Sequence, residues 1–196
     1  MVRIIFSCKL NNMRVLIQFF LSALFFSGII LMNGCKNAGS AVTASVAIEK
    51  YQCIPCGFDC DKEIFDAPGT CPHCKMVLVK QSTIHINSLP PENICAYISQ
   101  HPGLIILDVR TADEFAGKAD PDFGSLKGGI NIPVQMLESR IAELNAYKEK
   151  DILVYCSHSH RSPRATYILS QNGFTKATNL LGGMSVVTDS TCKQPR

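Results

Sequence analysis

The stretch that most constrains the fold runs from residue 151 to 173, where one cysteine separates a strand pattern from a helix pattern. Residues 151–155 are mostly apolar and β-branched, as a buried parallel strand requires. The helix predicted over 163–172 carries three signals, namely an N-cap, a first-turn proline and a C-cap glycine, at Ser162, Pro163 and Gly173. Cys156 therefore occupies a loop between a strand end and a helix start.

A loop in this position gathers backbone N–H groups that have no helical partner, and these groups favour an anion at its centre. The same field stabilises a thiolate, and Arg161 adds a fixed positive charge. We therefore predict that Cys156 is a catalytic nucleophile, with Arg161 and Ser162 as the other catalytic residues. The alternative is a cysteine that only packs in the core, since free Cys is among the most buried residue types.

Four short motifs follow one another along the C-terminal half: Asp108 to Arg110 after an apolar run, Gly124 to Pro133, Cys156 to Ser162, and Asn179 to Met184. Over residues 88–187 the chain resembles the single-domain rhodanese-like sulfurtransferases, and Cys156 to Ser162 fits their C-x4-R-[ST] loop. The resemblance implies an α/β fold with a parallel sheet flanked by helices. It also implies that a small anionic donor such as thiosulfate gives its sulfane sulfur to Cys156, without a cofactor for the transfer.

The resemblance further implies a substrate loop of Ser157, His158, Ser159 and His160, fixed from below by Asp108 and Arg110. The two histidines are unusual for the family: they either bind an anionic substrate when protonated, bind a metal when neutral, or are simply solvated. Three positions depart from the family pattern: Ser159 replaces a glycine, Ser125 a histidine and Met184 a tryptophan. The first departure matters most, because a residue with a Cβ is strained wherever the loop needs a positive φ.

Strands and helices are expected to alternate through a domain spanning 88–188, beginning with a helix over 90–100 capped by Ser88. The remaining predicted elements are strands over 104–109 and 129–132 and helices over 111–116 and 133–147. Alternation implies a parallel sheet covered on both sides, with its site at the carboxyl ends of the strands.

A cysteine-rich segment over 51–80 precedes this domain. It contains two C-x2-C pairs, Cys53 with Cys56 and Cys71 with Cys74, at a spacing typical of zinc ribbons. So short a segment cannot bury enough apolar surface to fold alone, so we predict a structural zinc or another thiophilic ion. Cys60 is a fifth thiol that either replaces a ligand or is spare. Disulfides are the competing explanation in an oxidising compartment.

The stretch from Tyr51 to Val79 also resembles the heavy-metal-binding domain attached to copper and heavy-metal export proteins, with Cys56 at its His position and Lys75 at its Gly position. This resemblance supports a second function, in which the protein handles metal ions and the rhodanese-like domain is a binding module. A phosphatase or arsenate reductase is disfavoured, because a protein-phosphatase loop has one more residue between Cys and Arg.

The N-terminus reads as a targeting segment. Arg14 precedes an apolar run over 15–32, and Asn33-Gly34-Cys35 follows it. This resembles a bacterial lipoprotein signal over 1–34, with Cys35 lipidated and residues 35–50 forming a tether. We therefore expect a cell-envelope protein held to a membrane by its lipid. An uncleaved transmembrane anchor is the alternative.

Charge and the remaining cysteines add little. The formal net charge is +3 at pH 7 without a basic stripe, which excludes nucleic acid as an expected partner. Cys95 and Cys192 show no partner pattern, and core packing is the expected role of Cys95.

Overall fold

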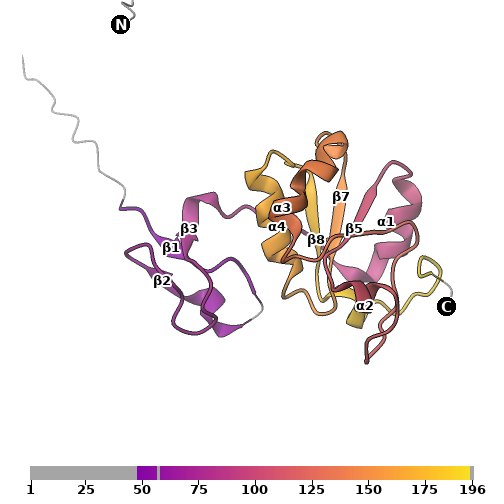
Figure 1. Cartoon of the computed structure of the whole chain (residues 1–196), viewed down its shortest axis with the longest axis horizontal. Coiled ribbons are helices and arrows are strands. Elements are labelled where there is room, and N and C mark those ends of the chain that lie inside the picture. Colours follow the sequence, from indigo (N-terminus) through magenta and orange to yellow (C-terminus); the bar gives the residue numbers. More distant parts are fainter. Residues whose placement is uncertain (1–47, 57, 195–196) are drawn as a thin grey trace, which may run out of the picture. The chain divides into compact units, whose positions relative to one another are not determined.

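The computed structural model describes residues 48–56 and 58–194 (Figure 1). The predicted signal segment over 1–34, Cys35 and most of the predicted tether lie outside the described residues. Across the described ranges, no helix combines the length and the apolar character needed to cross a membrane.

The cysteine-rich segment forms a small antiparallel sheet in the order β2-β1-β3. Its strands are β1 (Tyr51–Gln52), β2 (Ile64–Phe65) and β3 (Val79–Lys80), with a 3-10 turn at Asp59–Lys62. The interior of this segment consists mainly of thiols, and Leu78 is the buried aliphatic residue that packs against them. With so little apolar burial, we expect the segment to need a cross-link or a metal to hold its fold.

The C-terminal domain is built on a five-stranded sheet in the order β4-β8-β7-β5-β6. All its neighbouring strands pair in parallel, which confirms the predicted sheet. The strands are β4 (Asn87–Leu89), β5 (Ile105–Asp108), β6 (Ile130–Asn131), β7 (Ile152–Tyr155) and β8 (Ala177–Leu180). The strand that carries the cysteine loop, β7, is central and pairs with β5 and β8.

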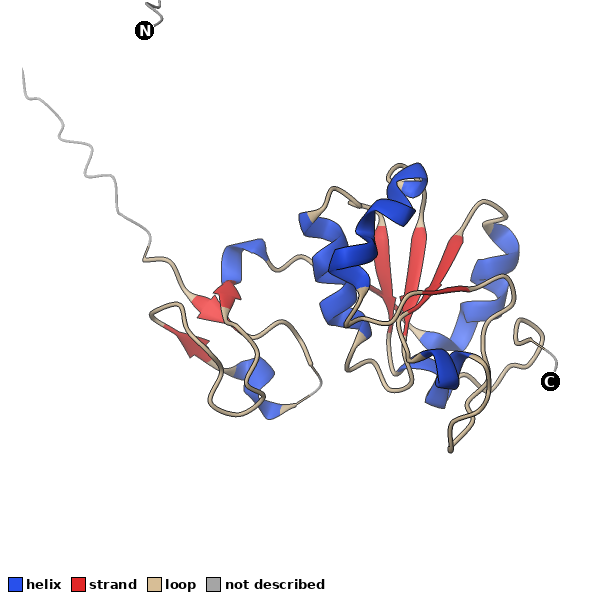
Figure 2. Cartoon of the chain, in the orientation of Figure 1, coloured by secondary structure: helices blue, strands red, loops and turns tan. Residues whose placement is uncertain are grey.

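Helices flank the red strands on both sides in Figure 2. The α-helices are α1 (Ile94–Gln100), α2 (Ala112–Phe115), α3 (Leu137–Arg140) and α4 (Ser162–Gln171). Four 3-10 helices of this region lie at Gln81–Thr83, Pro91–Asn93, Ile141–Tyr147 and Gly183–Val186.

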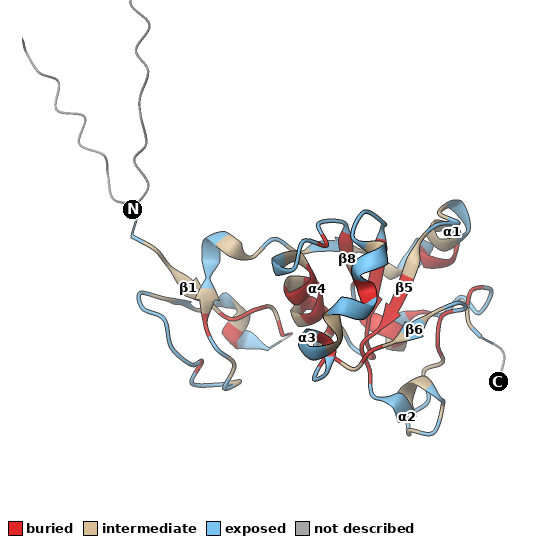
Figure 3. Ribbon diagram, turned by 45° about the horizontal axis from the view of Figure 1, so that its top comes forward, coloured by how far each residue is buried: buried red, intermediate tan, exposed pale blue. Residues whose placement is uncertain are grey.

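The core has two halves, one on each face of the sheet. Along β7, Ile152 and Val154 pack with residues of α3 and α4, whereas Leu153 and Tyr155 pack with residues of α1. This alternation follows from the period of two in a strand, and it buries every residue of β7 (Figure 3 shows the buried residues in red). The strand therefore gives Cys156 a rigid base.

Several local predictions differ from the structure. Ser88 does not cap a helix but lies in β4, which the sequence did not reveal, and the helix begins only at Ile94 after a 3-10 turn. The helix predicted over 133–147 is instead the short α3 followed by a 3-10 helix. Helix α4 begins at Ser162, and its N-cap residue is Arg161, which makes no side-chain capping bond.

Candidate active site

Cys156 lies at the carboxyl end of β7 and is fully buried. Its Sγ is 3.4 Å from the hydroxyl oxygen of Ser162, the first residue of α4. Ser162 is also fully buried, and its hydroxyl faces the thiol instead of capping the helix. This contact places a donor where a sulfur anion on Cys156 would need one.

Arg161 makes a two-pronged salt bridge with Glu114. Its Nη1 and Nη2 each donate to one carboxylate oxygen of Glu114 at 2.7 Å. The Ser157 hydroxyl donates to the same carboxylate at 2.8 Å, and Nη2 also reaches this hydroxyl at 3.2 Å. Both ends of the cysteine loop are thereby tied to α2.

Glu114 owes its position to the local sequence of α2. Thr111 is the N-cap, and Glu114 accepts from its backbone N–H at 3.0 Å in a reciprocal capping box. The hydrogen bonds from Arg161, with those from Thr111 and Ser157, outweigh desolvation and hold the pKa of the Glu114 carboxyl well below its usual range. Hydrogen bonding to Glu114, with a further contribution from Cys156, raises the pKa of Arg161. The pair is therefore ionised.

Ser159 adopts the left-handed conformation, with a φ of 57°. The strain expected at this departure from glycine is thus present. Its hydroxyl lies 3.2 Å from Oδ1 and 3.1 Å from Nδ2 of Asn179, a buried residue of β8. A hydrogen bond to a buried strand residue therefore holds the loop in the backbone shape that glycine would adopt freely.

His158 and His160 lie on the exposed side of the loop, with ring centroids 6.2 Å apart. The His158 ring meets the Phe123 ring edge-on at 5.0 Å. Aromatic packing thus positions His158, and a role for either histidine in binding the donor stays a prediction.

Asp108 and Arg110 form a buried pair beneath the loop. Arg110 Nε lies 3.0 Å from both carboxylate oxygens of Asp108, and Nη2 donates to the Ser125 hydroxyl at 3.2 Å. The guanidinium carbon lies 5.4 Å from the centre of the Tyr155 ring. Because Tyr155 directly precedes Cys156, this pair packs beside the strand end that carries the cysteine, and its support of the loop stays a prediction.

Gly183 supports the loop from the other side. Its φ is 64°, and a Cβ there would lie 2.5 Å from the Cys156 carbonyl oxygen. The next two residues, Met184 and Ser185, donate their backbone N–H groups to the carbonyls of Cys156 and Ser157, both at 2.9 Å. Only glycine permits this close approach.

Comparison with known proteins assigns the domain. The family model described as a rhodanese-like domain matches residues 96–190. Thiosulfate sulfurtransferase PspE of Escherichia coli is 32% identical over 76 residues, which cover 39% of this chain and 67% of PspE. The chain belongs to the rhodanese-like family.

Two further proteins are similar to this chain. A sulfurtransferase of Allochromatium vinosum is 26% identical over 99 residues, covering 50% of this chain and 85% of that protein. A rhodanese-related protein of Thermoplasma volcanium is 28% identical with a TM-score of 0.44, covering 54% of this chain and 93% of that structure. Family and relatives together indicate sulfur transfer by the rhodanese-like domain at the level of the family.

The cysteine-rich segment gathers its thiols differently from the predicted set. The Sγ atoms of Cys53, Cys60, Cys71 and Cys74 lie within 4.8 Å of one another, whereas Cys56 groups with Cys60 and Asp61. Tetrahedral zinc with zinc–sulfur bonds of about 2.3 Å places its sulfurs about 3.8 Å apart. The 3.6 Å between the sulfurs of Cys53 and Cys74 fits this geometry.

Cys95 forms a disulfide with Cys192, which corrects the expectation that Cys95 only packs in the core. The bond ties α1 to the C-terminal tail, whose residues donate to and accept from the segment around Ser125 and Lys127. A separation of 97 residues hides this pairing from sequence spacing.

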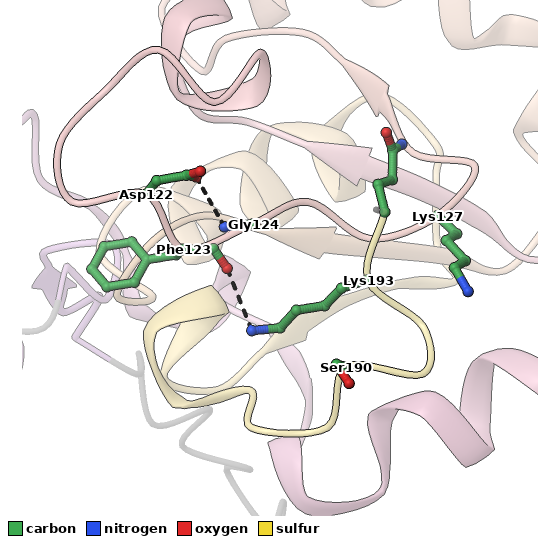
Figure 4. A pocket seen from close by; sticks show the side chains of 7 residues that line it. Asp122, Phe123, Gly124, Lys127, Ser190 and Lys193 are labelled. Carbon is green, nitrogen blue, oxygen red and sulfur yellow. Dashed lines mark hydrogen bonds between the residues drawn. The ribbon is translucent and has the colours of Figure 1, made fainter. Parts of the chain in front are cut away.

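A surface pocket lies between this tail and the loop before Lys127 (Figure 4). The Lys193 ammonium donates to the Phe123 carbonyl at 3.4 Å, and the Gly124 N–H donates to Asp122 at 3.1 Å. Cys156 is not among the residues that line this pocket, so we do not assign the donor site to it.

Sequence reasoning missed three residues that shape the rhodanese-like site: Glu114, Asn179 and Gly183. The capping box Thr111-x-x-Glu114 was a readable signal for the helix, but its use as an anchor for Arg161 depends on contact across 47 residues. Asn179 and Gly183 lie in the motif from Asn179 to Met184, but the sequence did not indicate what either residue contacts.

Proposed function

We propose that this protein is an exported sulfurtransferase that moves sulfane sulfur from thiosulfate, or a related small anion, through Cys156 to a thiophilic acceptor. The observation that carries the proposal is the placement of Cys156 at the end of β7, with the Ser162 hydroxyl 3.4 Å from its sulfur. The family relatives support the same chemistry.

The reaction has two displacements. The Cys156 thiolate attacks the outer sulfur of thiosulfate, a sulfur–sulfur bond forms, and the bond to the sulfonate sulfur breaks as sulfite leaves with the electron pair. A nucleophile such as cyanide then attacks the outer sulfur of the persulfide. Thiocyanate forms, and the Cys156 thiolate is regenerated.

The surrounding residues hold the charge that moves in these steps. Ser162 donates to the sulfur anion, and the start of α4 adds backbone N–H groups to the same place. Arg161 shapes the loop through Glu114 and supplies positive charge beside the thiol. Asp108 and Arg110 neutralise each other and support the strand end.

Intact-mass measurement of the full chain in detergent tests the proposal. Thiosulfate should add one sulfur atom, cyanide should remove it, and peptide mapping should place it on Cys156. Cys156→Ser, which exchanges only the sulfur for oxygen, should take up none while its circular dichroism is unchanged. Sulfur uptake by Cys156→Ser would show that Cys156 does not carry the transferred sulfur.

We also propose export and a lipid anchor at Cys35. The Cys95–Cys192 disulfide supports an oxidising compartment, where such bonds persist. Cys35→Ala should leave a precursor that retains residues 1–34, as seen by mass spectrometry of the membrane fraction. Normal processing and membrane retention of this variant would argue against lipidation there.

We further propose that the cysteine-rich segment binds a thiophilic ion such as zinc, because the thiol cluster fits a tetrahedral site. Bound there, the ion would cross-link a segment that has little core of its own. Chelation should unfold residues 51–80 and leave the rhodanese-like domain folded, which hydrogen exchange can follow segment by segment. Metal handling as the main function would be favoured if tight binding occurred without sulfur transfer.

A further inference from the structure

The paired-cysteine pattern and the structure differ on which thiols face one another. Because the sulfurs of Cys53, Cys60, Cys71 and Cys74 form one close group, we propose that these four thiolates bind a divalent d10 ion such as Zn²⁺ or Cd²⁺. Cys60, and not Cys56, is the fourth ligand. This inference rests on the metal site proposed above and names its ligands.

Burial supports this ligand set. Cys53, Cys60 and Cys71 are 0%, 2% and 0% exposed, and Cys74 is half-buried. Four thiolates around a divalent ion leave no open position, as in structural sites, and burial keeps water from competing for the ion. The expected occupant is therefore a soft ion held by sulfur alone.

The loop around the second pair presents its sulfurs as a metal knuckle does. The Cys71 backbone N–H donates to the Met76 carbonyl at 2.8 Å. The chain then turns through Lys75, which has a φ of 61° and donates its N–H to the Cys71 carbonyl at 3.1 Å. This turn places the Cys71 and Cys74 sulfurs in the same close group.

Asp61 engages Cys56 outside this group of four. Its carboxylate accepts from the Cys56 backbone N–H at 2.9 and 3.0 Å and lies 3.1 Å from the Cys56 sulfur, which donates to it. Although its sulfur is 3.7 Å from that of Cys60, Cys56 is not among the four sulfurs that lie within 4.8 Å of one another. Cys56 is therefore a neighbour of the site and not a ligand.

A hollow on the surface of the segment reaches two of the four ligands. It is lined by Cys60 and Cys74 together with Phe58, Asp59, Glu63 and His73. The edge of the cluster formed by Cys60 and Cys74 thus borders the route by which an ion enters. A chelator should accordingly remove the ion while the rest of the protein stays folded.

The test uses the full chain in detergent, reduced and freed of metal, with Co²⁺ as a spectroscopic probe and Zn²⁺ in competition. Wild type should show the absorption of a four-thiolate cobalt site. Cys60→Ser should lose about one quarter of the thiolate-to-cobalt intensity and weaken Zn²⁺ binding by more than about 100-fold, since even second-shell losses cost about 10–100-fold. The matched variant Cys56→Ser should keep the four-thiolate spectrum and bind Zn²⁺ within about tenfold of wild type.

Histidine variants distinguish the loss of one ligand from a loss of folding, because histidine can still bind the ion. Cys60→His should bind Co²⁺ with the spectrum of three sulfurs and one nitrogen, whereas Cys56→His should leave the four-sulfur spectrum unchanged. If the Cys56 variants changed the cobalt spectrum and the Cys60 variants did not, the ligand assignment would be wrong while the metal site itself would stand. Wild type that binds neither ion would overturn the metal site as well, and neither result would alter sulfur loading on Cys156.

Discussion

Arg161 and Glu114 face each other in a bidentate salt bridge, with both guanidinium nitrogens 2.7 Å from carboxylate oxygens. Arg161 closes the cysteine loop, and Glu114 comes from the short helix α2 that follows β5. The bridge therefore joins two strand ends of the sheet beside Cys156.

Glu114→Gln should lower the rate of sulfur loading from thiosulfate by at least about tenfold, because a displaced loop misaligns the thiol with its donor. The control Glu138→Gln removes an exposed carboxylate from α3 and should leave the rate unchanged. Single-turnover loading followed by mass spectrometry measures both variants. Equal rates in the two variants would show that the bridge does not position the loop.

The same carboxylate should contribute to stability in a defined pH range. Since the folded-state pKa of Glu114 is lowered, its contribution is fully present above the unfolded-state pKa of about 4.3. The contribution is lost progressively as the pH falls below that value toward the lower folded-state pKa. Urea unfolding between pH 3 and pH 7 should therefore show a steeper acid loss for wild type than for Glu114→Gln. Parallel pH profiles would contradict this linkage.

Ser159 separates backbone strain from hydrogen bonding. Ser159→Ala and Ser159→Gly both remove the hydroxyl that contacts Asn179, but only the glycine variant relieves the left-handed backbone. We expect Ser159→Gly to be more stable than Ser159→Ala by about 1 kcal/mol, the lower end of the cost of a Cβ in that conformation. Chemical denaturation measures the difference. Equal stabilities would mean that the loop relaxes out of the left-handed region.

Loss of the disulfide should destabilise the rhodanese-like domain. Cys95→Ser and Cys192→Ser should each lower the free energy of unfolding by about 2–5 kcal/mol, since the bond closes a long loop. The double variant should be no less stable than either single variant, because each single substitution already removes the whole disulfide. Thermal unfolding with and without a reductant tests this, and reduction should bring wild type close to the variants. Additive losses would show that the two cysteines act separately.

Local features account for what the sequence predicted well. The apolar run before Cys156, the helix signals at Pro163 and Gly173, and the alternation of elements all depend on residues close in the chain. They were enough to predict the parallel sheet and to place Cys156 at a strand end. Strand β4 escaped prediction because its three residues Asn87–Leu89 carry no alternating pattern and are ordered by pairing with β8.

Contacts between distant residues required the tertiary structure. The sequence assigned roles to Arg161 and Ser159 but none to their partners Glu114 and Asn179, which lie 47 and 20 positions away. In the same way the spacing of the C-x2-C pairs favoured Cys56, whereas the fold brings Cys60 into the group of four sulfurs. Short-range spacing determines which residues share a turn or a face, but chain folding over longer separations decides which side chains meet.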